Sequence, residues 1–388
     1  MSEIKVNSIK GVGASAAAIT VNNTDGTCTA NLTNRTNRRL TINGDFRIAQ
    51  RGTSSTSNGY QTVDRWNHNA GNTGVTVTFS QQSTTSSDTP YQNGFSNFFR
   101  IALSGAGTAN ANAYAEVITK LEAQDIANSG WNFKSSSSDI TLSFWVRPST
   151  NQTFYGLIRS YDGTSYANVF SFTASANNTW TKITKTISGN SNLQFDNNNA
   201  VGLQLLITPF YGTDYTNDRA VGTWTTFDSS NHFPDMASTW LTAGASTFDI
   251  TGVQLEVGSV ATDFEHRSFS QELALCQRYF FNVTGNNGQR TNIPAFANSA
   301  SNVRAMVQFP TPMRAVPTFS GTSTNIVFDS ADDSDTFLCS ALQSGGYLSN
   351  DSPHGMLIEA DPGGMTAGQG GVLEFRGNGS ELNFSAEL

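Results

Sequence analysis

The fold class follows from the segment Asp139-Ile140-Thr141-Leu142-Ser143-Phe144-Trp145-Val146-Arg147, in which two kinds of side chain alternate. Ile140, Leu142, Phe144 and Val146 occupy every second position, and Thr, Ser and Trp lie between them. Successive side chains of a β-strand point to opposite faces of a sheet. This alternation therefore predicts a strand with one buried face.

Strand-like runs of the same kind recur on both sides of this segment, with turn residues between them. They are residues 74–79, 97–103, 155–160, 168–173, 180–187, 200–208 and 247–257. Residues 200–208 are more continuously apolar than the others, which predicts a strand that is buried on both sides. Helical signal is slight, and it predicts one short helix over residues 113–127, with Val117, Ile118, Leu121 and Ile126 on one side. Many evenly spaced strands joined by polar turns predict an all-β protein built on a jelly-roll β-sandwich.

Pattern and composition divide the chain into four parts. Residues 1–39 are small and polar, and we expect either a flexible arm or an arm that attaches to another protein. Residues 40–267 hold the predicted jelly roll, and residues 282–388 resume short strands as a smaller β-domain. Residues 268–281 are predicted to form a helical linker, because their Ser-x-x-Gln start is typical of a capping box.

Composition argues against several classes of function. The 388 residues carry a formal net charge of −8 and contain no long apolar run, which argues against nucleic-acid binding and membrane insertion. The three cysteines are far apart and the N-terminal residues include no apolar signal segment, so we expect synthesis in a reducing cytoplasm. Only 13% of residues are charged and 11% are aromatic, in a chain rich in Ser, Thr and Asn, as is common among sugar-binding and adhesive modules.

No phosphate-binding loop, HExxH zinc motif or GxSxG nucleophile elbow occurs in the sequence. We therefore expect a protein that is not an enzyme and needs no catalytic cofactor. A glycan-cleaving enzyme stays open as an alternative, because such an enzyme needs two convergent carboxylates. The candidates are Asp214, Asp218, Asp228 and Asp235.

Two groups of aromatic residues are the candidate ligand-binding residues. The first lies in the long segment 209–240 and includes Tyr211, Tyr215 and Trp224, with Asp228 close by in sequence. The second consists of Tyr155, Tyr161 and Tyr166, which lie on either side of Asp162-Gly163. Aromatic faces stack on sugar rings while carboxylates bind hydroxyl groups. The alternative is that these rings pack the segment onto the sandwich or onto a neighbouring subunit.

Separated motifs in this chain resemble a known protein family. They are Leu40-Thr41-Ile42-Asn43-Gly44-Asp45-Phe46, Tyr60-Gln61-Thr62-Val63-Asp64-Arg65-Trp66, Phe248-Asp249-Ile250-Thr251-Gly252-Val253-Gln254-Leu255-Glu256-Val257-Gly258, Ala261-Thr262-Asp263-Phe264-Glu265-His266-Arg267-Ser268-Phe269 and Glu272-Leu273-Ala274-Leu275-Cys276-Gln277-Arg278-Tyr279. They resemble a module of bacteriophage tail-fibre and other virion structural proteins. The opening and closing strands are also similar to carbohydrate-binding modules of the galactose-binding-like jelly-roll type.

The resemblance implies a virion protein that is made in the host cytoplasm and is often a homotrimer. We expect a tail fibre or receptor-binding appendage that attaches to host cell-surface polysaccharide by multivalent, non-covalent binding. Residues 1–39 would contact other tail or virion proteins. A capsid decoration or head fibre protein is the first alternative, and a glycan depolymerase is the second.

One metal site is also a candidate. The first and last strands of a jelly-roll module run side by side, so Asp45 and Asp249 are candidate ligands of a structural calcium ion. The alternative is that the two carboxylates are solvated or hydrogen-bonded within the protein.

Overall fold

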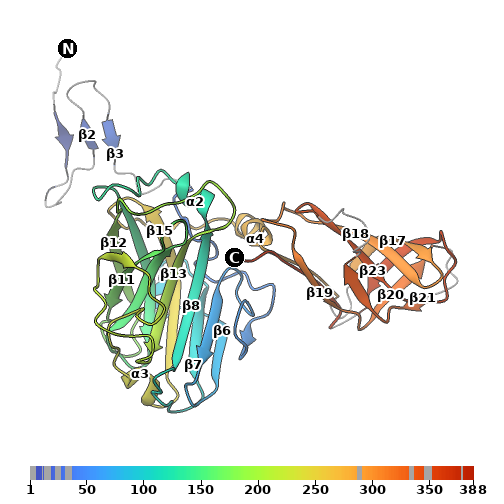
Figure 1. Ribbon diagram of the computed structural model, residues 1–388, viewed down its shortest axis with the longest axis horizontal. Coiled ribbons are helices and arrows are strands. Elements are labelled where there is room, and N and C mark those ends of the chain that lie inside the picture. Colours follow the sequence, from blue (N-terminus) through green and yellow to red (C-terminus); the bar gives the residue numbers. More distant parts are fainter. Residues whose placement is uncertain are drawn as a thin grey trace.

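The structure is a computed structural model that describes residues 6–10, 12, 19–21, 28–30, 37–285, 291–331, 336–344, 352–376 and 379–388. Two six-stranded sheets make up the larger part of the chain (Figure 1). Sheet I has the order β14-β11-β10-β13-β8-β5 and sheet II the order β12-β9-β15-β7-β6-β4. The predicted all-β fold with a jelly-roll sandwich is confirmed.

The strands of both sheets are antiparallel to their neighbours. Sheet I consists of β5 (Asn67–Gly71), β8 (Tyr114–Glu122), β10 (Phe154–Ser160), β11 (Tyr166–Phe172), β13 (Val201–Tyr211) and β14 (Trp224–Thr226). Sheet II consists of β4 (Ser54–Ser55), β6 (Val77–Ser83), β7 (Asn97–Leu103), β9 (Asp139–Pro148), β12 (Thr181–Ser188) and β15 (Thr247–Val257). Three short helices accompany them: α1 (Thr89–Gln92), α2 (Ala123–Ala127) and α3 (Thr239–Thr242).

The prediction of a helix over residues 113–127 is wrong for most of its length. Residues Tyr114–Glu122 form strand β8, and only Ala123–Ala127 are helical. Ala115, Val117 and Leu121 point into the core between the sheets, while Ile118 joins a second apolar cluster on the other face. Because both faces of the strand are covered, its apolar residues do not show the strict alternation of a half-exposed strand.

The core lies between the two sheets and is rich in aromatic rings. Trp66 is fully buried, and its ring centroid lies 4.8 Å from that of Phe46. The predicted strand of residues 139–147 lies within β9, where Ile140, Leu142, Phe144 and Val146 all enter this core. The opening segment closes the sandwich beside β15, since the Val253 amide donates to the Gly44 carbonyl at 2.8 Å.

Helix α4 (Phe269–Gln277) lies between the sandwich and a second β-structure (Figure 1). The predicted capping box is confirmed, because Ser268 Oγ accepts from the Gln271 amide and the Gln271 side chain accepts from the Ser268 amide. Cys276 is fully buried, and burial raises the pKa of its thiol well above the ordinary value. Such a thiol is a packed core group rather than a nucleophile.

The second β-structure has its own apolar core and two sheets. The three-stranded sheet has the order β16-β25-β19, made of β16 (Phe280–Thr284), β19 (Thr318–Thr322) and β25 (Glu381–Ser385). The seven-stranded sheet has the order β21-β20-β24-β17-β18-β23-β22. Its strands are β17 (Thr291–Ser299), β18 (Asn302–Gln308), β20 (Ile326–Ser330), β21 (Thr336–Leu338), β22 (Leu342–Ser344), β23 (Gly355–Ala360) and β24 (Gly370–Phe375).

Residues 386–388 return to the sandwich, so the C-terminal end lies beside it (Figure 1). Arg65, which is buried in the sandwich, pairs with Glu387, and Arg51 reaches the same carboxylate at 3.2 Å. Lys120 Nζ donates to the backbone oxygen of Leu388 at 3.0 Å. These contacts fasten the second β-structure to sheet I.

The N-terminal region contributes a small three-stranded sheet of β1 (Ser8–Ile9), β2 (Ile19–Val21) and β3 (Cys28–Ala30). Most of the predicted attachment arm, residues 1–39, lies outside the described residues, and its role stays a prediction. Within the part of the chain that the structure describes, no helix has the length and apolar character required to cross a membrane.

Candidate functional site

Strand alternation gives sheet I an outer face, turned away from sheet II. On β10, Phe154 and Ile158 enter the core between the sheets, so Tyr155, Leu157 and Arg159 point outward. Strand register then aligns outer residues in rows across the sheet. Arg159 is level with Gln204 of β13, which is level with Lys120 of β8. The next row is apolar and consists of Val169, Leu157, Leu206 and Ile118.

The segment 212–238 covers the apolar row. Phe233 is fully buried and packs with Leu157, Leu206 and Tyr211. Arg219 fixes the segment from within, because its Nη1 donates to the Asn231 carbonyl at 2.8 Å. The segment predicted as one long loop, 209–240, is therefore partly regular: β13 continues to Tyr211, and β14 adds an edge strand.

Two of the predicted ligand-binding residues have their rings covered. Tyr211 is only 5% exposed and its hydroxyl donates to the Glu116 carboxylate. Trp224 is 9% exposed, and its indole Nε1 donates to the Ser188 carbonyl at 2.8 Å. Both rings pack the segment onto the sandwich, as the alternative interpretation expected, and Trp224 also lines a second hollow of about 420 Å³ with Phe170 and Lys185.

The other predicted residues stay accessible. Tyr155, Tyr161 and Tyr215 are half-buried and all lie over the outer face of sheet I. Asp228 is exposed at the rim of the segment, where it accepts hydrogen bonds from the amide and hydroxyl of Ser230 at 2.9 and 2.7 Å. The structure thus brings the three tyrosines, which are far apart in sequence, to one face.

Polar groups gather at the centre of this face. The Tyr161 hydroxyl donates to Gln204 Oε1 at 2.5 Å, and Asn69 Nδ2 donates to Glu116 Oε1 at 2.9 Å. The Arg159 guanidinium lies 4.3 Å from the Tyr161 ring centroid and 3.4 Å from that of Phe227. The ring of His232 lies 5.1 Å from that of Phe227. We call Glu116, Arg159, Tyr161, Gln204, Phe227 and His232 the outer-face cluster.

Burial sets the protonation of the outer-face cluster. Burial raises the pKa of Glu116, although hydrogen bonds from Tyr211 and Asn69 oppose that change. Burial, followed by the charges of Arg159 and Arg219, lowers the pKa of His232 to about 4. His232 is therefore neutral at neutral pH, and Arg159 supplies the positive charge. The face combines half-buried aromatic rings with amide, carboxylate and guanidinium groups.

Sequence reasoning missed Glu116, Arg159 and Gln204. Glu116 lies in the segment that was predicted to be helical, and Gln204 lies in a run that was predicted to be buried on both sides. A period-two count from the core residues would have turned all three toward the outer face. The register that places them side by side is a property of strand pairing, which the sequence does not state.

The structure does not bring the two candidate calcium ligands together. Asp249 accepts from Arg100 Nε at 2.7 Å and from Arg147 Nε at 2.9 Å, whereas Asp45 lies 3.1 Å from Arg47 Nε. Val253 is the residue beside Gly44, and the four residues from Asp249 to Val253 span on the order of 10 Å. Among the described residues, no group of three or more His, Cys, Asp or Glu side chains is placed to hold a metal ion. The shared-site interpretation is therefore corrected to two carboxylates with arginine partners.

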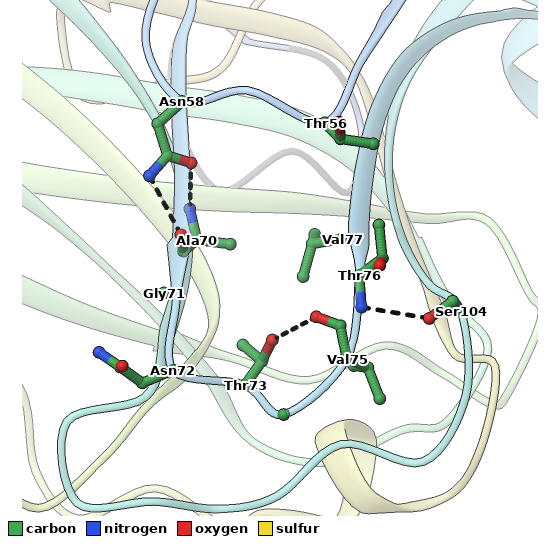
Figure 2. Close-up of a pocket in the computed structure, with 11 residues that line it drawn as sticks. Thr56, Asn58, Ala70, Gly71, Asn72, Thr73, Val75, Thr76, Val77 and Ser104 are labelled. Carbon is green, nitrogen blue, oxygen red and sulfur yellow. Dashed lines mark hydrogen bonds between the residues drawn. The ribbon is translucent and has the colours of Figure 1, made fainter.

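A hollow of about 740 Å³ lies elsewhere, where sheets I and II meet at β5 and β6 (Figure 2). Asn58 makes two hydrogen bonds with the backbone of Ala70, and Ser104 Oγ accepts from the Thr76 amide at 3.2 Å (Figure 2). Its lining residues carry neither an aromatic ring nor a charged side chain. The outer-face cluster is the better candidate, because it offers both.

No protein-family model and no curated protein matches this chain. Solved structures with a similar arrangement include tailspike protein 4 of bacteriophage CBA120, with 13% identity, a TM-score of 0.30 and coverage of 57% of this chain and 21% of that one. The family 11 carbohydrate-binding module of Clostridium thermocellum Lic26A-Cel5E has 13% identity, a TM-score of 0.27 and coverage of 55% and 98%. The CBM22-1 xylan-binding domain of Paenibacillus barcinonensis Xyn10C has 10% identity, a TM-score of 0.26 and coverage of 54% and 94%. TM-scores of this size assign neither a family nor a ligand to this chain.

Proposed function

We propose that this protein is a virion structural protein, a tail fibre or receptor-binding appendage, that attaches to host surface polysaccharide. The observation that carries the proposal is the outer-face cluster. There the half-buried ring of Tyr161 and the half-buried guanidinium of Arg159 lie on the outer face of a jelly-roll sandwich, over the buried amide of Gln204 and the buried carboxylate of Glu116. Binding is reversible, and no covalent step is part of the proposed function.

The chemistry of the cluster suits a sugar. A pyranose ring has apolar C–H faces that pack on aromatic rings, and Tyr155, Tyr161 and Tyr215 supply such rings. Its hydroxyl groups need paired donors and acceptors, which the Arg159 guanidinium and the Tyr161 hydroxyl oxygen offer, while Gln204 and Glu116 are buried beneath them and hold the tyrosines in place. Each contact of this kind is weak. A homotrimer would raise the total affinity by multivalency, because the second and third sites bind at high effective concentration.

The virion assignment is supported by the sequence motifs that resemble phage tail-fibre modules. Residues 1–39 would contact other tail or virion proteins, and three copies of the chain would associate. Light scattering on the purified protein should give about three times the chain mass of 41.6 kDa, and a monomer mass at working concentration would contradict the trimer. Immuno-gold labelling of particles should place the protein at the tail, while labelling of the head would favour a capsid decoration or head fibre.

Binding of the purified full-length chain to whole host bacteria tests the proposed function. Binding should be lost when surface polysaccharide is removed enzymatically. Binding that survives this removal would contradict a glycan receptor. The same mixture should release no new reducing ends, because the proposed role involves no cleavage. Release of reducing ends would favour a depolymerase instead.

Replacing Tyr161 by alanine should weaken polysaccharide binding about tenfold, which corresponds to about 1.4 kcal/mol. The substitution removes a ring face and the hydrogen bond to Gln204. Tyr91→Ala is the matched control, because Tyr91 is exposed and lies on the short helix α1, outside sheet I. Affinity measured by isothermal titration should fall for Tyr161→Ala alone. Equal affinities for the two variants would remove Tyr161 from the site.

A further inference from the structure

We infer that the outer-face cluster selects an acidic glycan and that Arg159 binds a sugar carboxylate. This inference rests on the proposed function and adds the class of ligand. Uronic acids and sialic-acid-like sugars carry such a group. The Arg159 guanidinium contacts two aromatic rings, and its two terminal nitrogens have no carboxylate partner among the described residues.

Arg159 is held in place but not neutralised. Its Nε donates to Ser165 Oγ at 2.9 Å, and its guanidinium lies between the rings of Tyr161 and Phe227. Among the described residues, neither Nη1 nor Nη2 has a hydrogen-bond or ion-pair partner. Arg219, on the same face, donates to the backbone carbonyls of its own segment. Four other arginines pair with a carboxylate: Arg65, Arg100, Arg147 and Arg278.

The surroundings of Arg159 hold a further cation together with acidic groups. Lys120 lies in the same row, with Gln204 between it and Arg159. Burial lowers the pKa of Lys120, and the charges of Arg65 and Arg159 lower it further, whereas the Glu387 carboxylate raises it. The neighbouring acid, Glu116, already accepts from Tyr211 and Asn69, and burial raises its pKa. Arg159 and Lys120 are therefore two cations in one row, and the Glu387 carboxylate and the Leu388 oxygen lie near Lys120.

A carboxylate fits this environment better than a hydroxyl group does. A guanidinium with two free nitrogens can bind a carboxylate through two parallel hydrogen bonds. The flanking rings of Tyr161 and Phe227 limit the access of water to the pair, which strengthens it. They also fix the plane of the guanidinium, so little side-chain entropy is lost on binding. The sugar ring attached to that carboxylate would lie next to the Tyr161 ring.

The experiment compares charged and neutral forms of the same glycans. The full-length chain is applied to an array of bacterial surface polysaccharides, each printed in native and in carboxyl-reduced form. We expect binding to members that carry uronic or sialic-type acids, and a loss of about tenfold or more after reduction. Carboxyl reduction leaves phosphate and sulfate esters intact. Binding that persists after reduction on such members would overturn the carboxylate assignment.

Two variants assign the charge to Arg159. Arg159→Gln should weaken binding to acidic members about tenfold and leave weak neutral binding unchanged, and Arg159→Lys should fall between Arg159→Gln and the parent. Lys182→Gln is the matched control, because Lys182 is exposed on β12 of the other sheet and also loses one positive charge. Near-ultraviolet circular dichroism checks that each variant is folded.

The outcomes separate this inference from the proposed function. Equal binding to neutral and acidic glycans, still reduced by Tyr161→Ala, would overturn the acidic-glycan inference and leave glycan attachment standing. Equal affinities of Arg159→Gln and Lys182→Gln for acidic members would also overturn it. Failure of the chain to bind any member in either form would contradict both proposals together.

Discussion

Replacing Glu272 by alanine is expected to lower the free energy of unfolding by about 3–5 kcal/mol, a large fraction of the roughly 5–15 kcal/mol of a typical domain. Glu272 is fully buried on helix α4, where it accepts from Arg39 Nη2 and, at 2.5 Å, from the Asn43 amide. Arg47 and Arg267 approach the same carboxylate at 3.9 and 3.8 Å. Removing it would leave the fully buried Arg39 without its carboxylate partner, and Arg47 and Arg267 would keep only Asp45 and Glu265 as neighbouring acids among the described residues.

Chemical denaturation followed by tryptophan fluorescence measures this effect. Glu272→Gln keeps an acceptor oxygen but removes the charge, so its loss should be smaller than that of Glu272→Ala but still clear. Asp218→Ala serves as the control, because Asp218 is exposed in the segment 212–238 and forms no ion pair with any residue that the structure describes. Unfolding of Glu272→Ala and Asp218→Ala at the same denaturant concentration would contradict this account. The contacts of Glu272 with its neighbouring arginines would then not be what joins helix α4 to the sandwich.

Replacing Arg65 by alanine is the second change with a large expected effect. Arg65 is 1% exposed, and its guanidinium pairs with Glu387 and donates to the Lys120 carbonyl at 2.6 Å. It also lies 3.4 Å from the ring centroid of Tyr279. Loss of this side chain leaves the buried Glu387 carboxylate with fewer partners and opens a cavity, so we expect a loss of about 3–5 kcal/mol.

A double variant tests whether charge or packing causes that loss. Arg65→Met fills much of the volume but leaves the Glu387 charge without its main partner, whereas Arg65→Met with Glu387→Gln removes both charges. The double variant should be more stable than Arg65→Met alone. In the single variant the Glu387 carboxylate has lost its main cationic partner, whereas the glutamine that replaces it in the double variant carries no charge and needs no such partner. Thermal unfolding measures the stabilities, and limited proteolysis near residues 278–285 shows whether the second β-structure has detached. Equal stabilities of the single and double Met variants would mean that packing on Tyr279 dominates.

The sequence carried most of the information about the sandwich. Alternation over residues 139–147 predicted a strand correctly because one of its faces is buried in a continuous core. The capping box of Ser268 and Gln271 predicted the start of α4, since its two hydrogen bonds are local and need no tertiary partner. The prediction of a helix over residues 113–127 was wrong because β8 is covered on both faces. The spacing of its apolar residues is therefore typical neither of a half-exposed strand nor of an amphipathic helix.

The candidate site was predictable only in part. The sequence identified Tyr155, Tyr161 and Tyr215, which the structure places on one face of sheet I. It also selected Tyr211 and Trp224, whose rings are buried. An aromatic residue in a polar segment gives the same sequence pattern whether its ring faces solvent or packs the segment onto the sandwich. Arg159 became a candidate only when strand register showed that it lies without a carboxylate beside it. Tertiary neighbours of this kind are not encoded in local pattern.

The central claim is that polysaccharide binds on the outer face of sheet I. Hydrogen–deuterium exchange of the full-length chain, with and without a bound host polysaccharide, tests it most directly, because exchange reports local protection along the backbone. The account predicts that binding slows exchange in segment 212–238 and in the turn at residues 161–165, which carry the rim of the outer-face cluster. Protection confined to the hollow at residues 70–77 or to residues 280–388, with no change over sheet I, would contradict it.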